Sequence, residues 1–531
     1  MFDYIIVGAG TAGCALTHRL SADPAARVLL LEAGQADTRA EIHIPAAFSR
    51  LFKTEVDWAY ETEPQPHLAN RRLFWPRGKV LGGSSSINAM IYIRGHRADY
   101  DGWAARGCTG WGFSDVLPYF KRSEDNARGA SAYHGVGGPL RVEDLREPHP
   151  LSLRFIEAAQ GVGLPANDDF NGAEQEGAGL YQVNQRGGRR ESGATAFLKP
   201  IRHRDNLTIE TGAQATRVLF EGTRAVGIEY VQGGETQQAH AAEEVLLCGG
   251  AINSPQLLML SGVGPVDHLR AQGIEVVADR SEVGSNLQDH LIVGVRYRSK
   301  EGGTLLSAES PLNIARYLLT RRGLLTSNVA EAGAFAFTRS GPTPDLQFHV
   351  APVLFAEHGL EPPPEHGFSL GPTLVRTETR GHIRLRSADP FAAPAIDPNY
   401  FAHEGDLYTL IEGVRLAREI VAQAAYDGVR GEELTPGPNL KTDAQIAQYI
   451  RETAETLYHP VGTCRMGPDT EAVVDLDLRV KGVEGVRVVD ASVMPTVVNG
   501  NTNAPTLMIA EKAADLIRNG SPVVSEAALA A

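Results

Sequence analysis

The chain has 531 residues, more than one hydrophobic core usually serves, so we expect two or three domains. Its composition, 43% hydrophobic and 21% charged, is typical of a soluble globular protein, and its net charge of −14 argues against nucleic acid as a partner. The four cysteines are scattered and form no CxxC pair, which argues against a disulfide framework and a zinc cage and indicates a reducing compartment.

The N-terminus, MFDYIIVGAG, has no basic region, long apolar stretch or small-residue cleavage site, so we expect no secretory signal. Nowhere do about 18 apolar residues run without interruption, so we expect no membrane-spanning helix. The predicted location is therefore the cytoplasm, with peripheral contact on the inner face of the membrane left open.

The first predicted elements are a buried strand at 2–7, a glycine turn at 8–13, a helix at 14–22 and a second buried strand at 27–32. Further strand-like runs lie at 206–211, 225–231, 243–250, 346–352, 381–387 and 486–492, and helical patterns at 252–261, 405–424, 442–454 and 504–519. No long linker separates these elements, so we expect the domains to be interleaved along the chain.

The glycine turn fits the pattern G-x-G-x-x-G through Gly8, Gly10 and Gly13. It follows a strand, opens a helix, and is trailed by Glu32 at the end of the next strand, 19 residues after Gly13. In that context the glycines let the backbone approach a pyrophosphate, and the carboxylate can accept hydrogen bonds from ribose hydroxyls. The motif predicts a bound dinucleotide and leaves open whether it is FAD or NAD.

The segment 310–327, SPLNIARYLLTRRGLLTS, interleaves leucines and an isoleucine with three arginines. A membrane-surface or lid segment has this composition. A core helix with a basic outer face has it too and is the commoner arrangement, so we expect the core helix.

Two glycine-rich stretches, WPRGKVLGGSSSINAMIYIRG (75–95) and GGAINSPQLLMLSGVGP (249–265), resemble the two signatures of the GMC (glucose–methanol–choline) flavoprotein oxidoreductases. EVGSNLQDHL (282–291) and VVDASVMPTVVNGNTNAPTLMIAEKAADLI (488–517) resemble that family too. Four motifs in the right order are very specific. The resemblance is strongest to the choline-dehydrogenase-like branch, near bacterial dehydrogenases of alkanols and polyethylene glycol.

The resemblance implies an α/β fold (α+β overall) in which a Rossmann-like FAD domain is interleaved with a substrate domain of antiparallel sheet plus helices. The FAD domain would comprise 1–45, 75–100, 190–300 and 455–531. The substrate domain, or cap, would comprise 46–74, 101–189 and 301–454.

The resemblance also implies which residues contact FAD. They are Gly8, Gly10, Thr11, Ala12, Gly13, Glu32, Ala33, Arg77, Gly83, Ser84, Asn88, Ala89, Ala215, Asp490, Ala491, Asn501 and Thr506. Some members of the family bind FAD covalently through a histidine at the position that Ile87 occupies here. Isoleucine has no nucleophile, so we expect non-covalent FAD.

His459 lies in LYHPVGTCRMG (457–467) and could be a metal ligand, a redox partner of Cys464, a packed core histidine or a catalytic base. With Cys464 it would supply only two ligands, so we expect no metal. Oxidation of an alcohol needs a base near neutrality, and His459 resembles the family's catalytic histidine. The family's second group is His or Asn, and alignment on NAPTLMIAEKAAD assigns it to Asn503, which would donate a hydrogen bond to the substrate oxygen.

The expected reaction is therefore FAD-dependent oxidation of a primary alcohol to an aldehyde, with hydride transfer to flavin N5. The expected acceptor is a quinone or another acceptor that is not oxygen. Alternatives are an oxidase using O2, a choline dehydrogenase, a lyase or decarboxylase of the same fold, and, less favoured, a NAD-dependent dehydrogenase. Glu331 suggests a binding site for a quaternary ammonium group, but we expect it to be a structural carboxylate. The oligomeric state and the physiological alcohol stay open.

Overall fold

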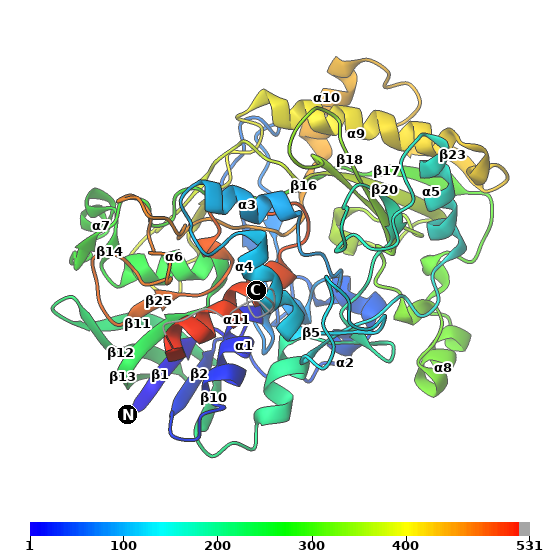
Figure 1. Ribbon diagram of the computed structural model, residues 1–531. Helices are drawn as coiled ribbons and strands as arrows, with labels where there is room; N and C mark the ends of the chain where they lie inside the picture. Colours follow the sequence, from blue (N-terminus) through cyan, green and yellow to red (C-terminus); the bar gives the residue numbers. More distant parts are fainter. Residues whose placement is uncertain (520–531) are drawn as a thin grey trace, which may run out of the picture.

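The computed structural model describes residues 1–519, which form two β-sheets with helices around them (Figure 1). The first sheet has the strand order β10-β2-β1-β13-β12-β11, and β25 pairs with β13. Its strands are β1 (Phe2–Val7), β2 (Val28–Glu32), β10 (Leu207–Thr211), β11 (Ala213–Glu221), β12 (Arg224–Gln232), β13 (Glu235–Leu247) and β25 (Val486–Val488). Every residue of β2 is buried, which is why its sequence, VLLLE, reads as a continuous apolar run.

The long strand β13 has two kinds of neighbour. Its first half pairs antiparallel with β12, and its second half pairs parallel with β1 and β25. Only the apolar second half was expected as a strand, because the first half, ETQQAH, has little of the composition that predicts one.

Three helices pack together beside this sheet: α1 (Thr11–Leu20), α11 (Asn503–Asn519) and α4 (Phe113–Ser123). The helix α6 (Gly250–Leu260) packs against β11. The chain therefore returns from its far end to place α11 against α1, so the two ends of the described sequence build one side of one domain (Figure 1).

The second sheet is antiparallel throughout, in the order β23-β17-β20-β19-β18-β7; the short strand β16 pairs with β20, and β24 pairs with β16. Its strands are β7 (Gly177–Leu180), β16 (Leu291–Ile292), β17 (Val295–Ser299), β18 (Ala332–Ala336), β19 (Leu346–Ala351), β20 (Gly367–Leu374), β23 (Arg430–Thr435) and β24 (Glu455–Thr456). The helices α5 (Pro150–Gly161) and α9 (Glu404–Ala422) cover it, and α10 (Asp443–Thr453) packs on α9 (Figure 1).

Smaller elements connect the sheets. They are α2 (Ala40–His43), α3 (Arg97–Ala105), α7 (Val266–Ala271), α8 (Pro311–Thr320), and the ladders β3 (Tyr60–Glu61) with β4 (Phe74–Trp75), β5 (Glu124–Asn126) with β6 (Leu140–Val142), β8 (Gln185–Arg186) with β9 (Arg189–Arg190), β14 (Val263–Gly264) with β15 (Ala278–Asp279), and β21 (His382–Arg384) with β22 (Ala395–Asp397). One continuous hydrophobic core reaches from β1 and β2 to β19 and β20. None of the helices within residues 1–519 is long and apolar enough to cross a bilayer.

The mixed fold with two interleaved sheets agrees with the expected class. The expected boundaries need two corrections, because β16 and β17, inside 190–300, and β24, inside 455–531, pair in the second sheet. The other boundaries stay predictions, and the last expected segment runs past the described residues. The core-helix interpretation of 310–327 is wrong, because α8 buries only Tyr317.

Candidate active site

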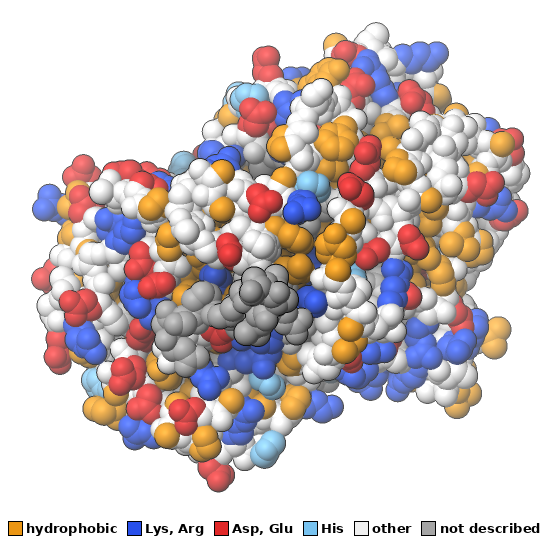
Figure 2. Space-filling view, in the orientation of Figure 1, with side chains coloured by type: hydrophobic (Ala, Val, Ile, Leu, Met, Phe, Trp, Pro, Cys, Tyr) orange, Lys and Arg blue, Asp and Glu red, His pale blue; other side chains and the backbone are white. Residues whose placement is uncertain are grey.

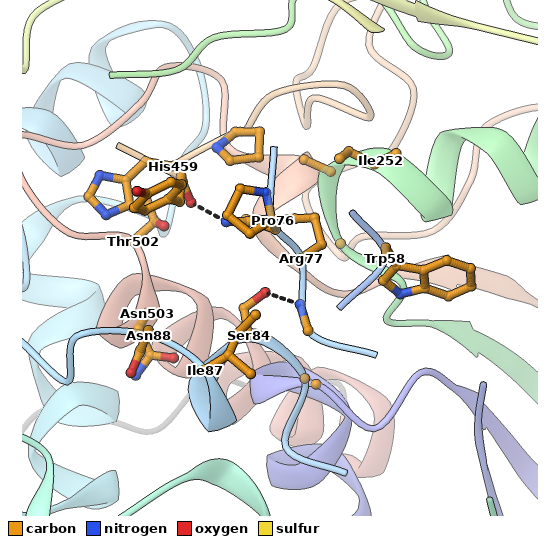
Figure 3. A pocket seen from close by; sticks show the side chains of 18 of the residues that line it. Trp58, Pro76, Arg77, Ser84, Ile87, Asn88, Ile252, His459, Thr502 and Asn503 are labelled. Carbon is orange, nitrogen blue, oxygen red and sulfur yellow. Dashed lines mark hydrogen bonds between the residues drawn. The ribbon is translucent and has the colours of Figure 1, made fainter. Parts of the chain in front are cut away.

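A long cavity lies between the two sheets and is lined by residues from both (Figure 3). It begins at the carboxyl ends of β1 and β2, the edge of a parallel sheet where nucleotides bind. It continues past the loop at 76–91 to His459 and the strands β16, β19 and β20. Every residue expected to contact FAD lines this cavity except Gly13.

Gly13 has a packing role instead. A Cβ atom on it would lie 1.9 Å from the Gly8 carbonyl oxygen, so only glycine lets α1 pack this closely on the preceding turn. At Gly10 a Cβ atom would meet nothing nearer than 4.0 Å, and that residue lines the cavity. The first glycine turn thus leaves its second glycine open to a ligand, as the dinucleotide motif requires.

Glu32 lies at the end of β2 and is buried. One carboxylate oxygen accepts a hydrogen bond from the Ala9 amide at 2.9 Å, and the other accepts from the Gly34 amide at 2.8 Å. Burial raises the pKa of Glu32 to about 7, against the lowering effect of these two amides. A pair of donor hydroxyls, as on a ribose, would stabilise the charged form further.

Asn88 faces the middle of the cavity. Its side chain is oriented by Arg190, which was not predicted as a site residue. Arg190, which is buried, donates from Nη1 to the Asn88 side-chain oxygen at 2.7 Å and to the Ser85 carbonyl at 3.1 Å. The Met90 amide donates to the same Asn88 oxygen at 3.0 Å. With its oxygen used twice, Asn88 offers its NH2 group to a ligand. Burial without an acidic partner lowers the pKa of Arg190 to about 9.

Asp490 lines the cavity, but its carboxylate is hydrogen-bonded to other residues of the protein. It accepts from the Gly250 amide at 2.9 Å, the Ser254 hydroxyl at 2.6 Å and the Ser492 amide at 2.8 Å. These bonds join the first turn of α6 to the segment after β25. Asp490 therefore holds two walls of the cavity together.

The backbone around His459 is fixed by Asp289, from the segment 282–291. Its carboxylate accepts from the His459 amide at 2.7 Å, from the Thr456 hydroxyl at 2.6 Å and from the Tyr400 hydroxyl. Burial raises the pKa of Asp289 to about 6. The residue before the histidine, Tyr458, has a φ of +68°, so the loop takes a backbone conformation that these bonds must hold.

The imidazole of His459 contacts two other side chains. Its Nδ1 lies 3.0 Å from Nδ1 of His290, and its Nε2 lies 3.3 Å from the side-chain nitrogen of Asn501. Because an amide NH2 group only donates, Nε2 is the acceptor in this arrangement and Nδ1 donates to His290. Burial, then His290, His349 and Arg77, hold the pKa of His459 well below its usual range, so the ring is neutral and its Nε2 lone pair accepts the hydrogen bond from Asn501.

Asn503 lies elsewhere in the cavity (Figure 3). Its side-chain oxygen accepts from the Thr11 hydroxyl at 2.7 Å, and its nitrogen donates to Asn184 at 3.4 Å. It thus joins the start of α11 to the start of α1. The structure brings Asn501 to His459, whereas the sequence alignment assigned that place to Asn503.

The segments that build this site match a known family. Residues 2–292 and 377–510 match the two profiles described as GMC oxidoreductase. The chain belongs to the GMC oxidoreductase family. It is 47% identical to an alcohol dehydrogenase [acceptor] of Pseudomonas putida, over 97% of this chain and 96% of that protein. It is 46% identical to the mitochondrial choline dehydrogenase of Homo sapiens, over 98% and 90% of the two chains.

A solved structure agrees with the sequence relatives. Pyridoxine 4-oxidase from Mesorbium loti superposes with a TM-score of 0.89 at 35% identity, over 97% of this chain and 98% of that chain. The GMC oxidoreductase described here is thus an FAD-dependent enzyme that acts on CH–OH donors. Its residues fit FAD, because the open Gly10, the buried Glu32 and the starts of α1 and α11 lie along one cavity.

The part of the cavity beyond His459 is mainly apolar. Its lining includes Phe48, Phe52, Ile292, Ala351, Phe355 and Leu370. The acidic side chain there is Glu455, which has 16% of its side chain exposed and whose pKa burial raises to about 7.

Glu331 lies outside this lining. It is buried and accepts from the His149 amide at 2.7 Å and from the hydroxyls of Ser152 at 2.8 Å and Ser327 at 2.6 Å. These three donors make it a structural carboxylate, so it does not form a site for a quaternary ammonium group.

Proposed function

We propose that this GMC oxidoreductase oxidises an uncharged primary alcohol to an aldehyde, with His459 as the base and Asn501 as the hydrogen-bond donor. The observation that carries the proposal is the unprotonated Nε2 of His459, which accepts a hydrogen bond from the Asn501 amide at 3.3 Å. Oxidation of the alcohol removes a proton from its oxygen and a hydride from its carbon. FAD supplies the hydride acceptor when bound, and this chain supplies the rest.

His459 accepts the hydroxyl proton at Nε2, and its neutral state makes that possible without prior deprotonation. Asn501 can turn its NH2 group from Nε2 to the substrate oxygen and stabilise the developing negative charge. Nδ1 of His290 accepts a hydrogen bond from the Nδ1–H group of His459. This bond fixes the tautomer in which Nε2 carries no proton. Asn501 thereby takes the role that the sequence analysis gave to Asn503.

The residues proposed to hold FAD fall into two groups along the cavity. Gly8, Gly10, Thr11, Ala12, Glu32, Ala33 and Ala215 line the end nearest β1 and β2, and Arg77, Gly83, Ser84, Asn88, Ala89, Asp490, Ala491, Asn501 and Thr506 line the remainder. We propose that the FAD is non-covalent, because the buried Ile87 offers no nucleophile where it lines the cavity. Acid precipitation should release the flavin into the supernatant, and colour in the pellet would contradict this.

An uncharged substrate is favoured by the apolar lining beyond His459. Choline is the second candidate, and Glu455 is the observation that favours it, since a carboxylate beside aromatic rings suits a quaternary ammonium group. However, a pKa of about 7 leaves this carboxylate only partly charged, and the cations Arg296 and Arg71 lie close enough to act on it. For these reasons we place choline second.

The acceptor proposed here is a quinone or another acceptor that is not oxygen, and the proposed location is the cytoplasm with a peripheral membrane contact. One anaerobic experiment tests reaction and acceptor together. The yellow protein is mixed with short, medium-chain and aromatic primary alcohols and with choline, the flavin absorbance is followed, and air is then admitted.

Bleaching by uncharged alcohols and slow return of colour in air is the expected result. Bleaching by choline alone would establish the second candidate. Rapid return of colour would indicate an oxidase. If no alcohol bleached the flavin, the oxidoreductase proposal would fail, and a lyase or decarboxylase reaction would be the one to assay.

A further inference from the structure

The helix α8 exposes most of its apolar side chains to solvent, unlike an ordinary surface helix. Leu312, Leu318 and Leu319 are 80%, 60% and 85% exposed, whereas the buried side chain of the helix is Tyr317, whose hydroxyl donates to the Gly188 carbonyl at 3.2 Å. A surface helix normally turns its apolar residues to the core and its polar residues to solvent. Here the leucines face outward.

The exposed apolar side chains form one continuous face. Positions three, four and seven apart share a side of a helix, so Leu312, Ala315 and Leu319 form one row, and Pro311, Ile314 and Leu318 form the adjacent row. Figure 1 shows α8 projecting from the body of the molecule, below β23 and α5. Figure 2 shows hydrophobic side chains at the end of this projection, with Lys and Arg side chains beside it.

The charges beside this face are mainly positive. Arg316 and Arg322 share a single carboxylate, Glu147, at 2.9 Å and 3.7 Å. Arg321 lies over the Tyr317 ring at 4.9 Å and has no acidic partner among the described residues. The exposed Arg189, on the neighbouring strand β9, has none there either. This region is basic although the chain as a whole carries a net charge of −14.

We propose that the α8 face, Pro311, Leu312, Ile314, Ala315, Leu318 and Leu319, docks on an anionic lipid bilayer. The leucines would enter the boundary between headgroups and acyl chains, and the arginines would contact the lipid phosphates. A second copy of the chain is the competing occupant. A two-fold contact through α8 would bring the arginines of one copy against the same arginines of the other, which disfavours it.

The position of α8 gives the docking a consequence for catalysis, and this part rests on the proposed function. A small apolar cluster of Tyr317, Leu325 and Ala308 packs against Ala46, in the 3-10 helix Pro45–Leu51. That 3-10 helix carries Phe48 into the cavity lining. A bilayer that holds α8 would therefore lie near the apolar half of the cavity, where an apolar alcohol or a quinone could enter from the lipid.

The test is flotation of the FAD-bound enzyme with vesicles of phosphatidylcholine, with and without phosphatidylglycerol. The wild type should float with the anionic vesicles and much less with the neutral ones. Substitution L312S/L318S/L319S should weaken binding at least about tenfold, because three leucines lose their apolar contact with lipid. Substitution R189Q/R321Q should weaken it about fivefold per arginine, on the anionic vesicles alone. Neither variant touches the catalytic residues.

Leu153→Ser is the matched control, because Leu153 is 49% exposed on α5 and does not belong to the α8 face. It should float as the wild type does. The proposal is overturned if the wild type ignores anionic vesicles, or if the triple variant floats unchanged. It is also overturned if the wild type is a dimer that the triple variant converts to monomers without any lipid binding.

Alcohol-dependent flavin reduction is measured in parallel in detergent-free buffer with a water-soluble alcohol. It should be the same in the wild type and in all variants. A variant that no longer floats but reduces its flavin normally bears only on the membrane proposal, and supports it. A wild type whose flavin no alcohol reduces would contradict the proposed function and leave the membrane proposal untouched.

Discussion

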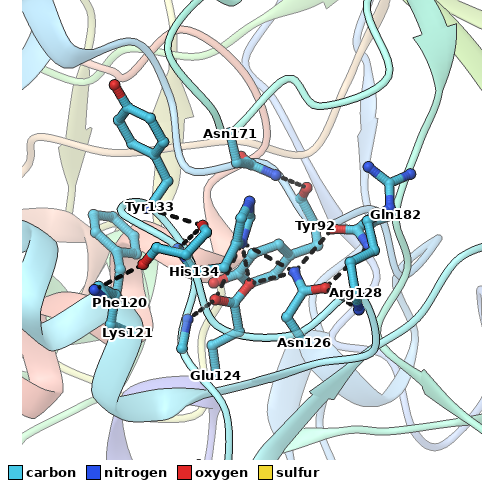
Figure 4. A network of polar contacts seen from close by, with 12 residues as sticks. Tyr92, Phe120, Lys121, Glu124, Asn126, Arg128, Tyr133, His134, Asn171 and Gln182 are labelled. Carbon is cyan, nitrogen blue, oxygen red and sulfur yellow. Dashed lines mark hydrogen bonds and ion pairs between the residues drawn. The ribbon is translucent and has the colours of Figure 1, made fainter.

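Two buried histidines in this protein have pKa shifts in opposite directions. Burial is the main cause of the low pKa of His459, and His290, His349 and Arg77 lower it further. His134 lies between two carboxylates. Its Nδ1 is 2.9 Å from Glu124 (Figure 4), and its Nε2 is 2.9 Å from Asp169. Burial lowers the pKa of His134, but the hydrogen bonds to Asp169 and Glu124 outweigh it, so this pKa is raised.

Burial lowers the pKa of both histidines, and the acidic neighbours of His134 are what reverse the direction of its shift. The raised pKa of His134 favours its charged form, and the ring forms a buried clamp with Glu124 and Asp169. Glu124 also accepts from Arg94 at 2.7 Å and from the Gly135 amide at 2.8 Å, which fixes the end of the glycine-rich segment 75–95. His459 is held neutral and can accept a proton. The first cluster should therefore govern stability and the second should govern turnover.

The largest effect is expected from His459→Ala. Loss of a general base should lower kcat/KM about a hundred- to ten-thousand-fold. The ratio of flavin to protein should stay that of the wild type, because Gly10, Glu32 and Asn88 are unchanged. Stopped-flow reduction of the flavin by alcohol measures the first quantity and the visible spectrum the second. Flavin reduction at the wild-type rate would show that His459 is not the base.

Asn501→Ala and Asn503→Ala form a matched pair on one short segment. Removal of the donor beside His459 should lower kcat about a hundredfold. Asn503→Ala should leave kcat within a few-fold and weaken the junction of α1 and α11 by about 1 kcal/mol, since one hydrogen bond to Thr11 is lost. Steady-state kinetics and denaturant titration separate the two. The reverse pattern would return the donor role to Asn503.

Much of the fold was readable from the sequence, because buried strands such as β1 and β2 are continuous apolar runs. The direction of the α8 face was not, since periodicity defines a face without saying what it meets. The asparagine beside His459 is Asn501, two positions before the predicted Asn503, because an alignment orders residues along the chain without showing which side chain reaches the imidazole. His290 and Arg190 were missed because only the folded chain brings them to His459 and Asn88.

Glu124→Gln tests the other cluster. It leaves the buried Arg94 and His134 with one fewer negative charge, and loss of one partner of a buried ion pair costs about 3–5 kcal/mol. Denaturant unfolding should show this loss, while kcat per bound flavin should change little. Glu55→Gln, which removes an exposed partner of Arg39, should leave the unfolding midpoint unchanged. An unchanged midpoint in Glu124→Gln would contradict the clamp.

The smallest effect, and the one that separates the two histidines most directly, is their pH dependence. Because the folded pKa of His134 is raised, the stability it contributes is fully present below its unfolded pKa of about 6.5 and is lost as the pH rises through the folded pKa. The stability difference between the wild type and His134→Gln should thus shrink toward alkaline pH. The lowered pKa values of Glu124 and Asp169 affect stability at acid pH, where the stability that these carboxylates contribute is lost as the pH falls.

His459, being neutral already, should leave kcat/KM flat from neutral to alkaline pH. A stability difference that did not vary with pH would mean that His134 has the same charge folded and unfolded, and its carboxylates would then hold the loop by hydrogen bonding alone.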